Sequence, residues 1–343
     1  MQPKVKRIFL PRTKRIFFIA LGILSIIFVT KVLVWSMRTM RETGLSPITI
    51  FRLVFDSGTN LASQDGKTNV LLLGMSGGSH AGADLTDTII VLSLDTHKKT
   101  TAFISIPRDI WSDALKDKVN SAYHYGEEKK KGGGMVLAKA IMEDVVGMSI
   151  HYTLLIDFSG FEELIDLVGG IDINVPSAFT DPDFPIAGKE NDACDGDKEL
   201  KCRYEVLRFD AGLQHMDGER ALSYVRSRHA EGEEGSDFAR GRRQQDVLVA
   251  LKQKLMTPKL LLNPNQSIAL FDTFDRAVDT DMNAGELLTV GKGTFTTKEQ
   301  AVKRISLEPL LEAPSLWLYG RYVLVPIKDF PTVYAFIQEQ LKQ

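Results

Sequence analysis

An apolar run from Ile16 to Met37 divides this chain into two unequal parts. Lys31 is its only charged residue, and its 22 residues would extend over about 33 Å as a helix, enough to cross a hydrocarbon core about 30 Å thick. Six basic residues and no acidic one precede the run, so the positive-inside rule places the N-terminus in the cytoplasm. We therefore expect a cytoplasmic tail over residues 1–15, a single transmembrane helix over 16–37, and an extracytoplasmic remainder.

A cleaved signal peptide is the alternative interpretation of this run. The run is long for the apolar part of a signal peptide, and residues 35–44 contain no small-x-small cleavage site. Both interpretations export the rest of the chain to an oxidising compartment, in which Cys194 and Cys202 can pair. The sequence leaves open whether these two cysteines close a polar loop or remain separate thiols.

The remainder of the chain is acidic, because it carries 36 basic and 44 acidic residues. A net-acidic body argues against a nucleic-acid partner, which would require a basic face. Two cysteines exclude a disulfide-dense scaffold and a multi-cysteine zinc site. With 44% apolar and 25% charged residues, the composition is that of a globular protein.

Three apolar runs after residue 68 predict three β-strands, over residues 69–74, 87–95 and 100–107. A polar turn of four residues joins the second and third strands, so they form an antiparallel hairpin. A loop of twelve residues joins the first two, which is too short for a helical crossover. If all three strands are antiparallel, Asp87 and Arg108 lie at the same edge of the sheet.

Further elements follow the three strands. The sequence predicts helices over 134–147, 159–168, 217–225 and 236–256, strands over 151–158, 171–175 and 321–327, a loop-rich stretch over 176–212, and a final helix from Asp329. We therefore expect one α/β domain over residues 68–343, with a mixed central sheet flanked by helices. A juxtamembrane segment and linker over 38–67 would precede it.

Arginines give the strongest chemical signal. Several of them gather at predicted element ends, or on the helix face that continues the apolar stripe toward the N-terminus. Guanidinium groups match phosphate oxygens bidentately, and a helix N-terminus adds positive potential. The predicted pyrophosphate-binding set is Arg108, Arg226, Arg228, Arg240, Arg243 and Gln244. The alternative is a structural network of ion pairs with Asp84, Asp87, Asp109 and Asp237.

Two carboxylates, Asp84 and Asp87, lie just before the second strand. Hard oxygen ligands beside a phosphate site suggest Mg²⁺, with Asp87 as the stronger candidate and Asp84 as the weaker one. The alternative is that both carboxylates cap the loop. Gly74, Ser76 and Gly78 match a G-x-S-x-G nucleophile elbow, but that motif requires a helix next, and here a strand follows.

The order of these motifs resembles the LytR-CpsA-Psr family, also called the cell envelope-related transcriptional attenuator domain. The motifs NVLLLG, LTDTIIVLSLD, FISIPRD, MDGERALSYVRSRH and DFARGRRQQ follow one another within residues 68–256. The resemblance implies an α/β domain with an apolar cavity for a prenyl chain. It also implies transfer of a glycopolymer, such as teichoic acid or capsular polysaccharide, from undecaprenyl diphosphate to peptidoglycan.

By this resemblance, Asp87 matches the magnesium-linked aspartate and Arg108 the pyrophosphate arginine, and the later arginine motifs match Arg226, Arg228, Arg240, Arg243 and Gln244. Many members also carry Asp and Arg in a G-x-D-x-R stretch after the first strand. This chain has Ser76 and Gly78 in those places. The second magnesium carboxylate is therefore missing from its usual position.

We therefore expect a phosphotransferase anchored in the cell membrane by a single helix. Its catalytic residues would be Asp87, Arg108 and Asp109, with Asp87 or Asp109 as the base and Mg²⁺ as the cofactor. Its partners would be a polyprenyl-diphosphate-linked glycopolymer, peptidoglycan and the lipid bilayer. The alternatives are a polyprenyl-diphosphate hydrolase and a non-catalytic polyprenyl-lipid binding or regulatory protein.

Overall fold

The computed structural model describes residues 60–78, 80, 82–189, 191–255, 257, 264–298 and 301–342, together with Thr30 and Lys31. The chain divides into two compact units, Met1–Asp56 and Ser57–Gln343. The predicted tail, nearly all of the predicted membrane helix and most of the predicted linker lie outside the described residues. Among the helices that are described, none combines the length and the apolar character needed to cross a bilayer.

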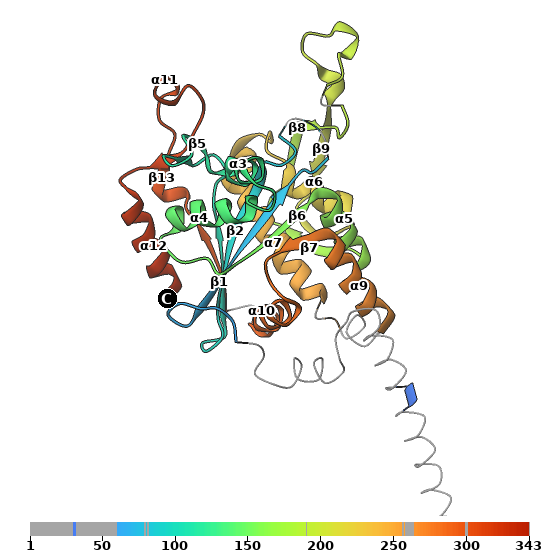
Figure 1. Ribbon diagram of the computed structural model, residues 1–343. Coiled ribbons are helices and arrows are strands. Elements are labelled where there is room, and N and C mark those ends of the chain that lie inside the picture. The colour runs from blue at the N-terminus through green and yellow to red at the C-terminus, as the bar shows by residue number, and fades with distance from the viewer. Residues whose placement is uncertain are drawn as a thin grey trace, which may run out of the picture. The chain divides into compact units, whose positions relative to one another are not determined.

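A six-stranded mixed sheet forms the centre of the second unit (Figure 1). Its order is β11-β6-β1-β2-β3-β12. The strands are β1 (Lys67–Met75), β2 (Thr86–Asp95), β3 (Thr100–Ser105), β6 (Tyr152–Asp157), β11 (Val278–Thr280) and β12 (Val302–Ser306). The pairs β1–β2 and β2–β3 are antiparallel, as predicted, whereas β6 runs parallel to β1 and β12 parallel to β3. The predicted mixed sheet is therefore confirmed.

Helices cover both faces of this sheet. Leu71 and Leu73 of β1 point to the face covered by α4 (Gly134–Val146) and α12 (Phe330–Lys342). Val70, one residue earlier, points to the other face, where α7 (Asp237–Leu255) and α10 (Ala284–Thr296) pack. The strand reads as a continuous apolar run because successive side chains alternate between two buried faces.

A second core lies outside the central sheet, where α5 (Phe158–Leu167), α6 (Gly218–Arg226) and part of α7 pack on two small antiparallel ribbons. The ribbons pair β7 (Ile171–Val175) with β10 (Gly212–Met216), and β8 (Phe179–Pro185) with β9 (Tyr204–Phe209). The predicted strand over 171–175 is therefore correct, but it does not join the central sheet. The predicted loop-rich stretch contains β8 and β9. In the segment that connects these two strands, Cys194 and Cys202 form a disulfide.

The remaining elements are short or peripheral. They are β4 (Trp111–Ser112), β5 (Asp117–Lys118), α3 (Ala122–Lys129), α9 (Pro264–Ala277), β13 (Leu311–Glu312), α11 (Leu316–Tyr319) and β14 (Val325–Pro326). Of the strand predicted over 321–327, only β14 forms. Its two residues pair with β13 rather than with the central sheet.

Candidate functional site

Arg108 lies just beyond β3, at the sheet edge where β2 begins. Its Nη1 donates a hydrogen bond of 2.6 Å to Oδ1 of Asp87, and its Nε lies 3.4 Å from Oδ2 of Asp109. The antiparallel β1–β2–β3 arrangement brings these three residues together, as the sequence predicted. Two carboxylates therefore hold one guanidinium group in a fixed orientation.

The two carboxylates differ in their surroundings. Asp109 is 3% exposed, and its Oδ1 also accepts a hydrogen bond from Nζ of Lys118. Asp87 is more open to solvent and faces the cavity described next. Because Asp109 does not line that cavity, it is not positioned as the base that the sequence suggested. Asp109 instead orients Arg108 through the contact with its Nε.

A cavity of about 650 Å³ lies in front of Arg108, and we call it the arginine cavity. It brings together four arginines, one carboxylate and one amide from β2, the segment after β3, the end of α6 and the residues after it, and the first turns of α7. Those residues are Asp87, Arg108, Arg226, Arg228, Arg240 and Gln244. The amide of Gln244 donates to Thr88 Oγ1 at 2.8 Å, so α7 is tied directly to β2.

Another part of the cavity lining is apolar. Phe158, Leu222 and Val225 contribute to it from α5 and α6. The guanidinium carbon of Arg226 lies 4.7 Å from the ring centroid of Phe158 and 5.1 Å from that of Phe184. Both distances are in the range of cation–π contacts. A cavity with guanidinium groups and an apolar wall matches a ligand that joins a phosphate group to a hydrocarbon.

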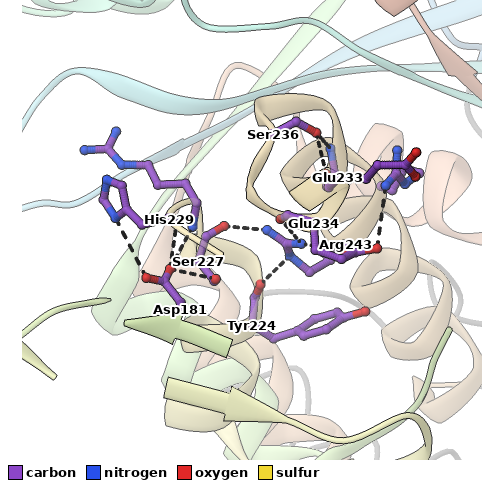
Figure 2. Close-up of polar contacts among 11 residues, drawn as sticks. Asp181, Tyr224, Ser227, His229, Glu233, Glu234, Ser236 and Arg243 are labelled. Atoms are coloured by element: carbon purple, nitrogen blue, oxygen red, sulfur yellow. Dashed lines mark hydrogen bonds and ion pairs between the residues drawn. The ribbon is translucent and has the colours of Figure 1, made fainter. Parts of the chain in front are cut away.

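Arg243 does not line the arginine cavity, although the sequence placed it in the pyrophosphate set. It is 2% exposed, and its donors are directed elsewhere (Figure 2). Its Nε donates to the carbonyl of Tyr224 at 3.0 Å, its Nη1 to the carboxylate of Glu234 at 2.9 Å, and its Nη2 to the carbonyl of Ser227. For this residue, the structural ion pair is the interpretation that the geometry favours. Arg243 fixes the segment that carries Arg226 and Arg228.

Asp84 also lies outside the cavity lining. Its Oδ2 is 2.7 Å from Nδ1 of His124, and this hydrogen bond raises the pKa of His124. Asp84 therefore pairs with α3 in this structure.

The cavity contains the carboxylates of Asp87, Asp157 and Glu162. Oδ1 of Asp157 accepts hydrogen bonds from Ser159 Oγ and from the amide of Gly160, so it caps α5. Among the described residues of this cavity, no three metal-binding side chains lie close enough together to hold one ion. Mg²⁺ is nevertheless often bound by one or two carboxylates together with substrate phosphates. Asp87 fits that minimal donor set.

Several polar groups of the cavity were not among the predicted site residues. Ser76 and His80 both line it, and Ser76 Oγ lies 3.1 Å from Nε2 of His80. The turn between them requires Gly77 and Gly78, whose φ angles are +70° and +82°. A Cβ at Gly77 would lie 2.9 Å from Cβ of Asp157. The G-x-S-x-G signal was visible in the sequence, but the position of His80 depends on how this loop folds.

Glu162 is a further carboxylate of the cavity that the sequence did not single out. Burial raises its pKa, and the negative charges of Glu219 and Asp166 raise it further, whereas Arg226 lowers it. Glu162 reaches the cavity because α5 and α6 pack side by side, and the spacing of residues along the chain does not reveal this packing.

The comparisons with known proteins agree with this architecture. The family model of the LytR_cpsA_psr family matches residues 49–329. The Enterococcus faecalis polyisoprenyl-teichoic acid–peptidoglycan teichoic acid transferase TagU is 27% identical over 255 residues, which are 71% of this chain and 72% of TagU. The Staphylococcus aureus regulatory protein MsrR is 30% identical over 197 residues, which are 56% of this chain and 50% of MsrR.

Among solved structures, the crystal structure of B. subtilis TagV superposes with a TM-score of 0.58 at 24% identity, over 82% of this chain and 99% of the chain in that crystal structure. This likeness confirms a central mixed sheet flanked by helices. The residues matched by the family model include the whole sheet and every residue of the arginine cavity. The chain therefore belongs to the LytR_cpsA_psr family.

Proposed function

We propose that this protein transfers a glycopolymer from a polyprenyl-diphosphate carrier to peptidoglycan. The observation that carries this proposal is the convergence of Asp87, four arginines and Gln244 on a cavity that also has an apolar wall. A lipid diphosphate has both complementary parts. The TagU relative, named as a polyisoprenyl-teichoic acid–peptidoglycan teichoic acid transferase, supports the same reaction class.

In the proposed reaction, the arginines hold the diphosphate and stabilise the charge on its oxygens. A hydroxyl of the acceptor attacks the phosphorus atom that carries the glycopolymer. A new oxygen–phosphorus bond forms, and the bond to the prenyl monophosphate breaks. The hydroxyl proton passes to a carboxylate of the cavity.

Mg²⁺ is part of this proposal, with Asp87 as its protein ligand. The ion would neutralise part of the charge on the diphosphate. The ion pair with Arg108 uses Oδ1 of Asp87, so Oδ2 would remain as an oxygen ligand for the metal. Arg108, which also contacts Asp109, would face the phosphate oxygens.

The proposal also includes a single membrane helix over residues 16–37, with the N-terminus in the cytoplasm and the α/β domain outside. The apolar run and the basic residues before it support this topology. The substrates agree with it, because a polyprenyl carrier lies in the bilayer and peptidoglycan lies outside the cell membrane.

The test is a transfer assay with the full-length protein in liposomes. The donor is a polyprenyl-diphosphate-linked glycan, the acceptor is uncrosslinked peptidoglycan, Mg²⁺ is present, and products are identified by mass spectrometry. Arg108→Ala should abolish transfer. Arg304→Ala is the matched control, because Arg304 is exposed on β12 and does not line the cavity. Full transfer by Arg108→Ala would refute the proposal.

The MsrR relative, named as a regulatory protein, supports a second candidate, a regulator that binds the lipid without turning it over. Donor bound to the wild-type protein without any product would favour this candidate. A hydrolase is distinguished by its products, since it would release prenyl phosphate and leave no glycan on the acceptor.

A further inference from the structure

A second hollow, of about 820 Å³, lies against the β8–β9 hairpin, and we call it the hairpin groove. Its polar lining includes Asp183, Lys201, Arg203, Tyr204, Glu205 and Arg228. Figure 1 shows the yellow-green segment between β8 and β9 projecting beyond the rest of the α/β domain. The groove therefore lies where the hairpin leaves the domain.

The groove adjoins the arginine cavity. Arg228 and Pro185 line both hollows. A ligand in the groove can therefore reach the same guanidinium group that faces the proposed diphosphate. This shared boundary matters because a transferase must bring two substrates to one phosphorus atom.

A buried carboxylate fixes this boundary (Figure 2). Asp181 of β8 is fully buried, and its Oδ2 accepts hydrogen bonds from Ser227 Oγ at 2.8 Å, from the amide of Arg228 at 3.0 Å and from that of His229 at 3.1 Å. The ring of His229 also contacts the carbonyl of Asp183 at 3.1 Å. The hairpin and the arginine segment are thus held together as one unit.

A disulfide crosslinks the segment that carries part of the groove lining. Cys194 and Cys202 bridge the extension of the hairpin, and Cys202 lies between Lys201 and Arg203 in the sequence. The bridge restrains the segment that supplies these two cations and Tyr204 to the groove.

The chemistry of the lining points to a hydroxyl-rich polymer. The lining mixes acidic and basic side chains, and it includes Tyr204, which is 40% exposed. Carboxylates and guanidinium groups can accept from and donate to hydroxyl groups, while an aromatic ring contacts the apolar face of a sugar. The mixed charges do not select an anion or a cation alone.

We propose that the hairpin groove binds the acceptor glycan strand and presents its hydroxyl to the phosphorus atom beside Arg228. This inference rests on the proposed transferase function and adds the place of the second substrate to it. The strand lies along β9 and crosses into the arginine cavity at Arg228 and Pro185.

The test separates acceptor binding from donor binding in the full-length protein. Tyr204→Ala and Glu205→Gln are compared with the wild type in the transfer assay, with each substrate varied in turn. We expect the acceptor KM to rise about tenfold for Tyr204→Ala, equivalent to one lost contact of moderate strength. The donor KM should stay unchanged. Trp317→Ala is the matched control, because Trp317 is an 81% exposed aromatic residue on α11 and is absent from the groove lining.

A direct binding measurement accompanies the kinetics. Binding of uncrosslinked peptidoglycan strands is measured without donor for the wild type, Tyr204→Ala, the double variant Cys194→Ser/Cys202→Ser, and Arg108→Ala. We expect weaker binding by the first two variants and unchanged binding by Arg108→Ala. A thermal unfolding curve for each variant verifies that it is folded.

An unchanged acceptor KM in both Tyr204→Ala and Glu205→Gln, together with unchanged strand binding by Tyr204→Ala, would overturn the assignment of the groove. If the wild type transfers no glycan but binds strands in a Tyr204-dependent manner, the proposed transferase function fails and the groove stands. If transfer proceeds and no groove variant changes it, the groove fails and the transferase function stands.

Discussion

Removing the buried carboxylate of Asp181 tests whether the hairpin and the arginine segment form one unit. Asp181→Ala deletes the acceptor of the Ser227 hydroxyl and of the amides of Arg228 and His229. A buried donor left without a partner costs about 1–3 kcal/mol. Ser227 is fully buried, whereas Arg228 and His229 are partly open to water, so the hydroxyl bears the largest loss. We expect the free energy of unfolding to fall by about 3 kcal/mol.

The assay is denaturant unfolding at neutral pH, combined with transfer kinetics below the unfolding transition. Because Arg228 is displaced, the acceptor and donor KM should both rise. Asp172→Ala is the matched control, since Asp172 is an exposed aspartate paired with His215 at 2.7 Å, and it should cost less than about 1 kcal/mol. A loss below about 1 kcal/mol for Asp181→Ala, with both KM values unchanged, would refute the reasoning.

The same site has a defined pH dependence. Burial opposes ionisation of Asp181, but the hydrogen bonds from Ser227, His229 and Arg228 outweigh it, so its pKa lies below the ordinary value of 3.8. A lowered pKa stabilises the folded protein above pH 3.8, and that contribution is lost as the pH falls through the folded-state pKa. The difference in unfolding free energy between the wild type and Asp181→Ala should therefore shrink in acid.

Three further predictions concern the arginine cavity. Asp109→Asn should raise the donor KM about tenfold in steady-state kinetics, because Arg108 loses one of its two orienting carboxylates; an unchanged donor KM would contradict its positioning role. Glu162→Gln should raise the Tm at pH 7, because a raised pKa means that ionising Glu162 destabilises the folded state, and this gain should vanish below the ordinary pKa of 4.5. Chelation of Mg²⁺ should abolish transfer, and Asp87→Asn should require about tenfold more Mg²⁺ for half-maximal rate; full activity in EDTA would exclude the metal.

The central sheet could be predicted because its signal is local. The apolar runs of β1, β2 and β3 are continuous, and short connections fix two antiparallel pairings. The position of Arg108 beside Asp87 follows directly from that topology. The predicted helices over 134–147, 159–168, 217–225 and 236–256 agree with the observed ones within about two residues, since their apolar spacing and end residues are also local.

The β8–β9 hairpin could not be predicted in the same way. A register shift between Asp181 and Phe184 interrupts the alternation of side chains along β8. Pro182 and Pro185 also weaken the strand signal, because proline lacks the N–H that a ladder hydrogen bond needs. The buried carboxylate of Asp181 in this hairpin accepts its hydrogen bonds from residues 227–229, more than forty positions away in the chain. No local pattern reports such a contact.

The sequence by itself determined that the chain contains a mixed α/β domain and that its arginines gather near one sheet edge. It did not determine which arginines face a ligand. Arg240 and Arg243 are three residues apart on α7 and both are buried, at 6% and 2% exposure, yet only Arg240 lines the cavity. The difference arises because Glu234 and the carbonyls of Tyr224 and Ser227 lie against Arg243. Likewise, Asp84 pairs with His124, forty positions away, and Asp109 pairs with Lys118 at the end of the β4–β5 ribbon. Spacing along the chain determines which side chains share a face, but the tertiary structure decides which neighbours neutralise them.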